Sequence, residues 1–182
     1  MANRTFINNL NTQKYLQCGQ SWSGSTTSCG GSMCSEGCYI TSTAMVFKSF
    51  GDTVDPGTLL AALKPNAADC PINWTSAASK YGHTVGEQAP GTFDQLKAKL
   101  FDYIYNKNKP VVYCVSGSTT HAVVITGVNA TIPVDPDTGA PETAYLTSSM
   151  FYVNDPGNNS NSTLDQVFSR YPSSVKIVAY NK

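Results

Sequence analysis

The spacing of apolar and polar positions divides the chain into a first half that reads as helical and a second half that reads as strands. Apolar residues recur at helical spacing, often just after a residue that caps helices, throughout the first half. A capping Thr with a Gln three residues later predicts one more short helix near the end. The helices are expected at residues 38 to about 51, 56–63, 73–80, 92 to about 105, and 163–170.

Runs of β-branched and aromatic residues, bounded by turn residues, follow residue 109. A stretch rich in Pro, Asp and Gly at 133–143 predicts an excursion from a long hairpin, and the Gly- and Ser-rich segment 17–36 predicts an extended loop. Helices first and an antiparallel sheet second describe an α+β fold. No linker or repeat divides residues 1–182, so one domain is expected. The strands are expected at residues 111–115, 122–128, 150–154 and 176–180.

Composition and charge narrow the classes of function. The 182 residues are 41% hydrophobic, and 12 Lys and Arg balance 12 Asp and Glu. Without a basic stripe to neutralise phosphates, nucleic acid is not an expected partner. No apolar run reaches the ~20 residues that span a bilayer, and residues 1–10 are too polar for a signal peptide. We therefore expect synthesis in the cytoplasm without a recognisable signal peptide, with release to the cell wall or the extracellular space left open.

Three chemically versatile residues stand at the edges of predicted core elements. Cys38 follows a glycine and opens the first long apolar helix, where unpaired backbone N–H groups and the helix dipole favour a thiolate. His121 opens a strand, and Asp155 closes another. Taken singly, each has an ordinary explanation: a buried structural cysteine, a histidine at a sheet end, and an Asn-Asp-Pro-Gly turn. Together they have the layout of a thiol hydrolase.

These residues lie in segments that resemble the C39-like branch of the papain-like cysteine peptidases. Members carry a Gln, a Trp a few residues later, a Gly-Cys-x-x-Thr-Ser-x-Ala-Met-Val block, a His before an apolar strand, and an Asn-Asp-Pro strand end. The resemblance covers most of residues 15 to 180 and implies a papain-like fold, with the helix of the nucleophile packed on the antiparallel sheet. The matching positions here are Gln17, Trp22, 37–46, 121–127 and 154–156.

The resemblance assigns a role to each matching residue. Cys38 would attack a carbonyl carbon and form an acyl-enzyme, and His121 would stabilise the thiolate and later protonate the leaving amine. Asp155 would fix the tautomer of the histidine, although papain-type enzymes also use Asn, so Asn154 stays open. Strand alternation allows only one of the two to face His121.

The oxyanion donor would be Gln17, acting with the backbone N–H of Cys38, and Gln20 is the rival. The offset of five residues from Gln17 to Trp22 favours Gln17. Trp22 is expected to wall the cleft, or else to be a plain core residue. Tyr39 stands where the family usually has glycine, before Ile40 in place of proline, and would narrow the mouth of the site.

The remaining cysteines and the second histidine are given structural interpretations. Cys29 and Cys34 could close a small local disulfide in an oxidising medium, and Cys114 reads as a buried, inert thiol. A zinc site formed by Cys29, Cys34 and Cys38 lacks paired Cys-x-x-Cys spacing, so no metal and no cofactor is expected. His83 follows a predicted helix and is expected to be a solvated surface residue.

The sequence thus predicts a monomeric cysteine hydrolase that cleaves amide bonds. A peptidoglycan-degrading lysin of phage or bacterial origin, acting as an endopeptidase or amidase, is the leading expectation. Processing of a peptide precursor is the second possibility. A papain-like module that binds a peptide or wall fragment without cleaving it is the third.

Overall fold

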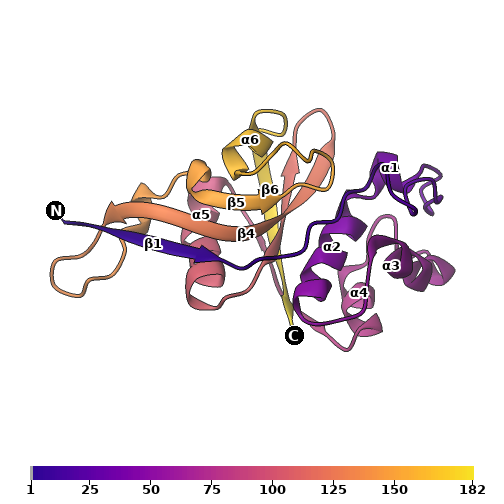
Figure 1. Ribbon diagram of the computed structural model, residues 1–182, viewed down its shortest axis with the longest axis horizontal. Helices are drawn as coiled ribbons and strands as arrows, with labels where there is room; N and C mark the ends of the chain where they lie inside the picture. Colours follow the sequence, from indigo (N-terminus) through magenta and orange to yellow (C-terminus); the bar gives the residue numbers. More distant parts are fainter. Residues whose placement is uncertain (1) are drawn as a thin grey trace.

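A six-stranded antiparallel sheet forms the centre of the protein, as seen in a computed structural model that describes residues 2–182 (Figure 1). The strands run in the order β1-β4-β3-β6-β2, and β5 pairs with β4 beside this path. Their bounds are β1 Asn3–Asn9, β2 Thr84–Pro90, β3 Val111–Ser116, β4 Thr120–Pro133, β5 Phe151–Asn154 and β6 Ser173–Asn181.

The helices begin where the sequence provides caps. Asp55 caps α3, Thr92 and Gln95 form a capping box on α5, and Thr163 and Gln166 form one on α6. Helix α5 passes directly into the π-helix η2, so the predicted helix to about residue 105 consists of two pieces. The bounds are α1 Met33–Glu36, α2 Cys38–Ser49, α3 Pro56–Leu63, α4 Trp74–Lys80, α5 Phe93–Phe101, η2 Asp102–Asn106 and α6 Leu164–Phe168, with short 3-10 turns at Lys64–Asn66, Thr143–Tyr145 and Ser148–Met150.

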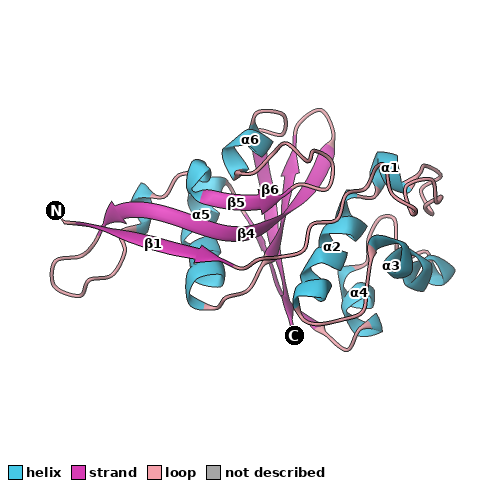
Figure 2. Cartoon of the chain, viewed as in Figure 1, coloured by secondary structure: helices cyan, strands magenta, loops and turns pink. Residues whose placement is uncertain are grey.

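Each face of the sheet carries its own hydrophobic core, because alternate residues of a strand point to opposite faces. Val111, Tyr113 and Val115 of β3 join a core with α5 and α6. Val112 and Cys114 join the other core, with α2, α3 and α4. Figure 2 shows α2, α3 and α4 grouped at one end of the molecule, away from α5. The sheet thus lies between two groups of helices, and α2 packs directly on β4.

The mixture of helices and antiparallel sheet confirms the α+β prediction, but the simple order of helices first and sheet second is wrong. β1 precedes every helix, and β2 lies between α4 and α5. Both are edge strands with little apolar content: Phe6 is the only buried residue of β1, and β2 alternates between half-buried and exposed positions. The long hairpin is present, since β4 and β5 pair antiparallel across the excursion of residues 134–150.

Among residues 2–182, no helix has both the length and the apolar character needed to cross a membrane.

Candidate active site

Cys38 is the first residue of α2 and is 7% exposed. Gly37 joins α1 to α2, and its backbone N–H donates to Met33 O at 2.8 Å. A Cβ at position 37 would lie 2.4 Å from that carbonyl, so the junction requires glycine. The thiol therefore sits at the N-terminal end of a 12-residue buried helix, where unpaired N–H groups and the helix dipole favour negative charge.

His121 lies near the start of β4 and hydrogen-bonds through Nε2 to Asp155 Oδ1 at 2.7 Å. Since Asp155 occupies Nε2, Nδ1 is the ring nitrogen left for another partner, and His121 and Cys38 line the same cleft. Burial alone would lower the pKa of His121. The hydrogen bonds and negative charges of Asp155 and Cys38 outweigh burial and raise the pKa of His121 to about 9.

Asp155 follows the last residue of β5 and is 1% exposed. Besides His121, its carboxylate accepts hydrogen bonds from Gly157 N and Asn161 Nδ2, both at 2.9 Å. Burial would raise its pKa, but the hydrogen bond and charge of His121, with the other donors, lower the pKa below its usual value. Asn154 points elsewhere and donates to Thr12 O at 3.0 Å. Of the two candidates, it is Asp155 that contacts the histidine.

Three neighbours of the His121–Asp155 pair were not singled out by the sequence. The Tyr171 ring stacks on the imidazole, with centroids 4.7 Å apart and planes at 21°. Gly157 lies against the ring edge, where an added Cβ would be 2.9 Å from His121 Cε1. Asn161 holds the second carboxylate oxygen of Asp155. Asn161 and Gly157 belong to a turn-rich stretch and Tyr171 precedes a proline, so nothing in the local pattern marks them.

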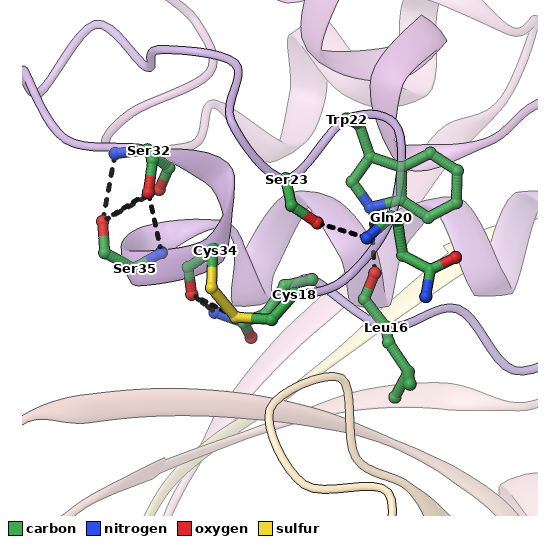
Figure 3. The surroundings of a disulfide bond; sticks show 9 residues. Leu16, Cys18, Gln20, Trp22, Ser23, Ser32, Cys34 and Ser35 are labelled. Atoms are coloured by element: carbon green, nitrogen blue, oxygen red, sulfur yellow. Dashed lines mark hydrogen bonds between the residues drawn. A yellow bond between two sulfur atoms is a disulfide. The ribbon is translucent and has the colours of Figure 1, made fainter.

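Gln17 is 6% exposed and borders the same cleft as Cys38 and His121. Its backbone N–H donates to Pro156 O at 2.9 Å, and its side-chain Nε2 donates to Cys34 O at 2.8 Å. Gln20 is exposed; its backbone N–H bonds to Ser23 Oγ, and its amide points away from the Cys18–Cys34 bond (Figure 3). Gln17, rather than Gln20, therefore lies at the cleft.

Trp22 does not line the cleft. Its Nε1 donates to Leu16 O at 2.9 Å (Figure 3), and its ring packs edge-on against Tyr15 with centroids 5.7 Å apart. The prediction of a cleft wall is therefore not met, and the ring stabilises the loop just before Gln17. Tyr39 does line the cleft, and it packs edge-on against Trp74 with centroids 5.6 Å apart.

The cleft itself is an open cavity of about 880 Å³ above the start of α2. Its apolar wall includes Tyr39, Ile72, Trp74 and Val175, and Val175 is 40% exposed. Lys176 lies over the Trp74 ring, with Nζ 5.4 Å from the centroid. The cleft therefore offers an apolar surface beside polar lining residues, among them Cys38 and His121.

The cysteines pair differently from the local bridge expected. Cys18 bonds to Cys34, and Cys29 bonds to Cys70, so the local Cys29–Cys34 bridge considered from the sequence does not form. The sulfurs of Cys29 and Cys70 lie within 4.8 Å of the Glu36 carboxylate, but they are bonded to each other and are not available as thiolate ligands. Among residues 2–182, the free cysteines are Cys38 and the buried Cys114. Burial raises the pKa of Cys114 to about 12, which agrees with an inert thiol.

His83 is not a solvated surface residue. Its side chain is 7% exposed and hydrogen-bonds through Nε2 to Asp52. The ring packs near Phe47 and Phe50, with both centroid distances at 5.0 Å. It therefore ties the end of α2 to the segment after α4 and stands apart from the cleft.

One family model matches the chain, over residues 11–178, and its description is Peptidase_C39 like family. No curated protein and no solved structure matches the chain. The matched range includes Gln17, Cys38, His121 and Asp155, and membership supports the activity of a cysteine peptidase. With nearly its whole length matched, the chain belongs to the Peptidase_C39 like family.

Proposed function

We propose that the protein is a papain-like cysteine hydrolase that cleaves amide bonds through Cys38, His121 and Asp155, with Gln17 as oxyanion donor. The observation that carries this proposal is the 2.7 Å bond from His121 Nε2 to Asp155, which leaves Nδ1 for the thiol at the start of α2. Such a chain of carboxylate, imidazole and nucleophile is the arrangement that activates a weak nucleophile.

The steps follow from the contacts. His121 takes the proton of the Cys38 thiol, and the thiolate attacks the carbonyl carbon of the substrate. Negative charge then develops on the carbonyl oxygen, beside the Cys38 backbone N–H and the Gln17 amide. His121 donates its proton to the leaving amine, and it then activates the water that hydrolyses the thioester. Asp155 stays ionised throughout and stabilises the imidazolium.

As substrate we propose the peptide part of peptidoglycan, so that the protein acts as a phage or bacterial lysin. Two disulfide bonds border the cleft, and such bonds persist in oxidising surroundings, which include the cell wall. The open cleft is lined by polar residues such as Glu36, Asp69 and Thr120 as well as by the apolar wall, which suits a peptide stem that remains attached to a larger polymer.

The test compares wild type with Cys38→Ala on purified bacterial peptidoglycan and on a mixed peptide library, with products identified by mass spectrometry. Wall fragments from the wild type only would support the lysin and identify the bond. Cleaved peptides without wall fragments would overturn the lysin in favour of a processing peptidase.

Thiol labelling separates an enzyme from a binding module. At mildly acidic pH an activated thiol reacts with iodoacetamide, whereas an ordinary one, with a pKa of about 8.5, reacts slowly. We expect rapid labelling of the wild type and none of Cys38→Ala. Cys114→Ala is the matched control and should label like the wild type, because Cys114 is 1% exposed. Slow labelling of Cys38, with both substrates intact, would favour a module that binds without cleaving.

A further inference from the structure

The side-chain amide of Gln17 takes its orientation from Cys34. A carbonyl oxygen only accepts, so the amide atom 2.8 Å from Cys34 O must be the nitrogen. An NH₂ group has two hydrogens, and the contact with Cys34 uses one of them. Cys34 O is the one acceptor found for this nitrogen among residues 2–182, so the second hydrogen remains for an oxyanion in the cleft that Gln17 borders.

The same Cys34 is bonded to the residue that follows Gln17. The disulfide Cys18–Cys34 spans a sequence separation of 16, and the intervening loop is rich in Gly and Ser. Without the disulfide, this segment would be attached to α1 through hydrogen bonds, such as Cys34 N to Ser23 O, and the surrounding packing. With it, the disulfide (Figure 3) links the residue that follows Gln17 to Cys34, whose carbonyl orients the Gln17 amide, so the two form one covalent unit.

That unit is joined to the nucleophile. Cys34 belongs to the short helix α1, and α1 and α2 share Gly37 as C-cap and N-cap. The N–H of Gly37 donates to Met33 O, and Cys38 is the next residue. The placement of Cys34 therefore sets the distance between the amide of Gln17 and the backbone N–H of Cys38, which are the two proposed oxyanion donors.

We propose that the Cys18–Cys34 disulfide positions Gln17 as oxyanion donor, so that the active enzyme combines an oxidised Cys18–Cys34 pair with a reduced Cys38. The inference rests on the proposed hydrolase. A dithiol reductant would transfer two electrons and two protons to the disulfide, yielding two cysteine thiols and the cyclic disulfide of the reductant. The Cys38–His121–Asp155 contacts would remain, but Gln17 would lose its fixed geometry, and the rate would fall.

The other disulfide provides a matched control. Cys29–Cys70 also borders the cleft, but it lies beside the Asp69 carboxylate, which accepts from Ser28 N at 2.8 Å and from Ser28 Oγ at 2.6 Å. The hydrogen-bond partners found for Gln17 in residues 2–182 are Cys34 and Pro156. Loss of Cys29–Cys70 should therefore affect the substrate wall more than the oxyanion donor.

The kinetic test uses Cys18→Ala/Cys34→Ala, Cys29→Ala/Cys70→Ala, Gln17→Ala, and the combination of the first with the last. Losing an oxyanion donor costs on the order of 10²-fold in kcat. We expect kcat to fall by about that factor, with little change in KM, in Cys18→Ala/Cys34→Ala and in Gln17→Ala. Combining the two changes should lower kcat no further. The Cys29–Cys70 variant should lose far less kcat. Independent, multiplying losses in the combined variant, or an unchanged kcat in the first, would overturn the proposal.

A wild-type measurement covers the case in which removal of the cysteines prevents folding. During stepwise reduction with dithiothreitol, mass spectrometry of alkylated peptides gives the fraction of each disulfide that has opened. We expect kcat to follow the fraction of intact Cys18–Cys34. A kcat that follows only the fraction of intact Cys29–Cys70 would contradict the inference.

Nuclear magnetic resonance supplies a readout that does not depend on turnover. The side-chain amide of Gln17, assigned by its absence in Gln17→Ala, should exchange slowly in wild type and in Cys29→Ala/Cys70→Ala. In Cys18→Ala/Cys34→Ala its hydrogens should exchange with water faster, and their chemical shifts should move toward those of free glutamine. If the wild type cleaves nothing, the proposed hydrolase fails, and this amide still decides whether the disulfide positions Gln17. An unchanged amide signal would refute the positioning.

Discussion

Replacement of Asp155 by asparagine tests whether the His121–Asp155 contact controls the protonation of the imidazole. The pKa of His121 rises from 6.5 to about 9, which corresponds to about 3 kcal/mol in favour of the charged ring. Asparagine has nearly the same shape but no charge. Burial, which lowers the pKa, would then be opposed by Cys38 alone. We expect the pKa of His121 to fall by more than one unit, equivalent to at least about 1.4 kcal/mol.

The assay is a proton NMR titration of the imidazole Cε1–H signals. The chain has two histidines, so every protein compared also carries His83→Gln, which leaves His121 as the single titrating imidazole. The control is Asn161→Ala, which removes one hydrogen bond to Asp155 Oδ2 but keeps the carboxylate. It should move the midpoint much less than Asp155→Asn.

The same pair makes stability depend on pH, with a defined sign. The folded-state pKa of His121 is raised, so its contribution is complete below about pH 6.5 while Asp155 is ionised, and it is lost as the pH rises through about 9. The folded-state pKa of Asp155 is lowered, so its contribution is present above the unfolded value of 3.8 and is lost as the pH falls through the lower folded value. In urea unfolding, the stability difference between wild type and Asp155→Asn should be large at pH 6 and smaller at pH 9.5.

Two results would refute this reasoning. A wild-type His121 that titrates near 6.5 would mean that the carboxylate does not favour the imidazolium. A midpoint that stays in place in Asp155→Asn would mean that another group, such as Cys38, holds the charge.

Three further substitutions test other parts of the structure. Gly157→Ala places a Cβ 2.9 Å from His121 Cε1 and should displace the imidazole. We expect kcat to fall on the order of 10²-fold, with an unchanged far-UV circular dichroism spectrum. An unchanged kcat would show that residue 157 does not constrain the position of His121. Tyr39→Ala removes part of the apolar wall and should raise KM about tenfold, with kcat nearly constant, in steady-state kinetics; a loss confined to kcat would refute a binding role. Asp52→Ala leaves His83 Nε2 without its partner and should lower the free energy of unfolding by about 1–3 kcal/mol in urea titrations, whereas no change would show that the pair does not contribute.

The sequence predicts those elements whose signals are local. The Thr92 and Gln95 box and the Thr163 and Gln166 box each lie within four residues, and both helices begin there. Strand β3 and the first half of β4 are apolar enough to be predicted from their residues alone, whereas β4 continues to Pro133, beyond the predicted end at residue 128. β1 and β2 lack such a signal because they are edge strands, and β1 buries only Phe6. Their pairing with β4 and β6 is a tertiary contact that outweighs local propensity.

Pairing of the cysteines could not be derived from spacing. Cys29 and Cys34 are close in sequence, yet each bonds to a more distant residue, with a separation of 41 in the case of Cys29–Cys70. A disulfide depends on how Cβ atoms approach one another in the folded chain, and residues 17–32, which precede α1, have no periodic pattern from which to infer that approach. The environment of His83 was missed for the same reason, since it depends on the packing of Phe47 and Phe50 at the end of α2.

At the candidate site, the residues proposed to react could be predicted, and the groups that orient them could not. A thiol at a helix start and a histidine at a strand start are local features, so Cys38 and His121 are visible in the sequence. The groups around them come from distant segments, as with Cys34 O against Gln17 and Tyr171 against His121. Orientation requires only an acceptor or a flat ring at the right place, which many residue types in many segments provide. Local chemistry can therefore suggest the reaction class, whereas the rate that the protein achieves depends on contacts that only the fold reveals.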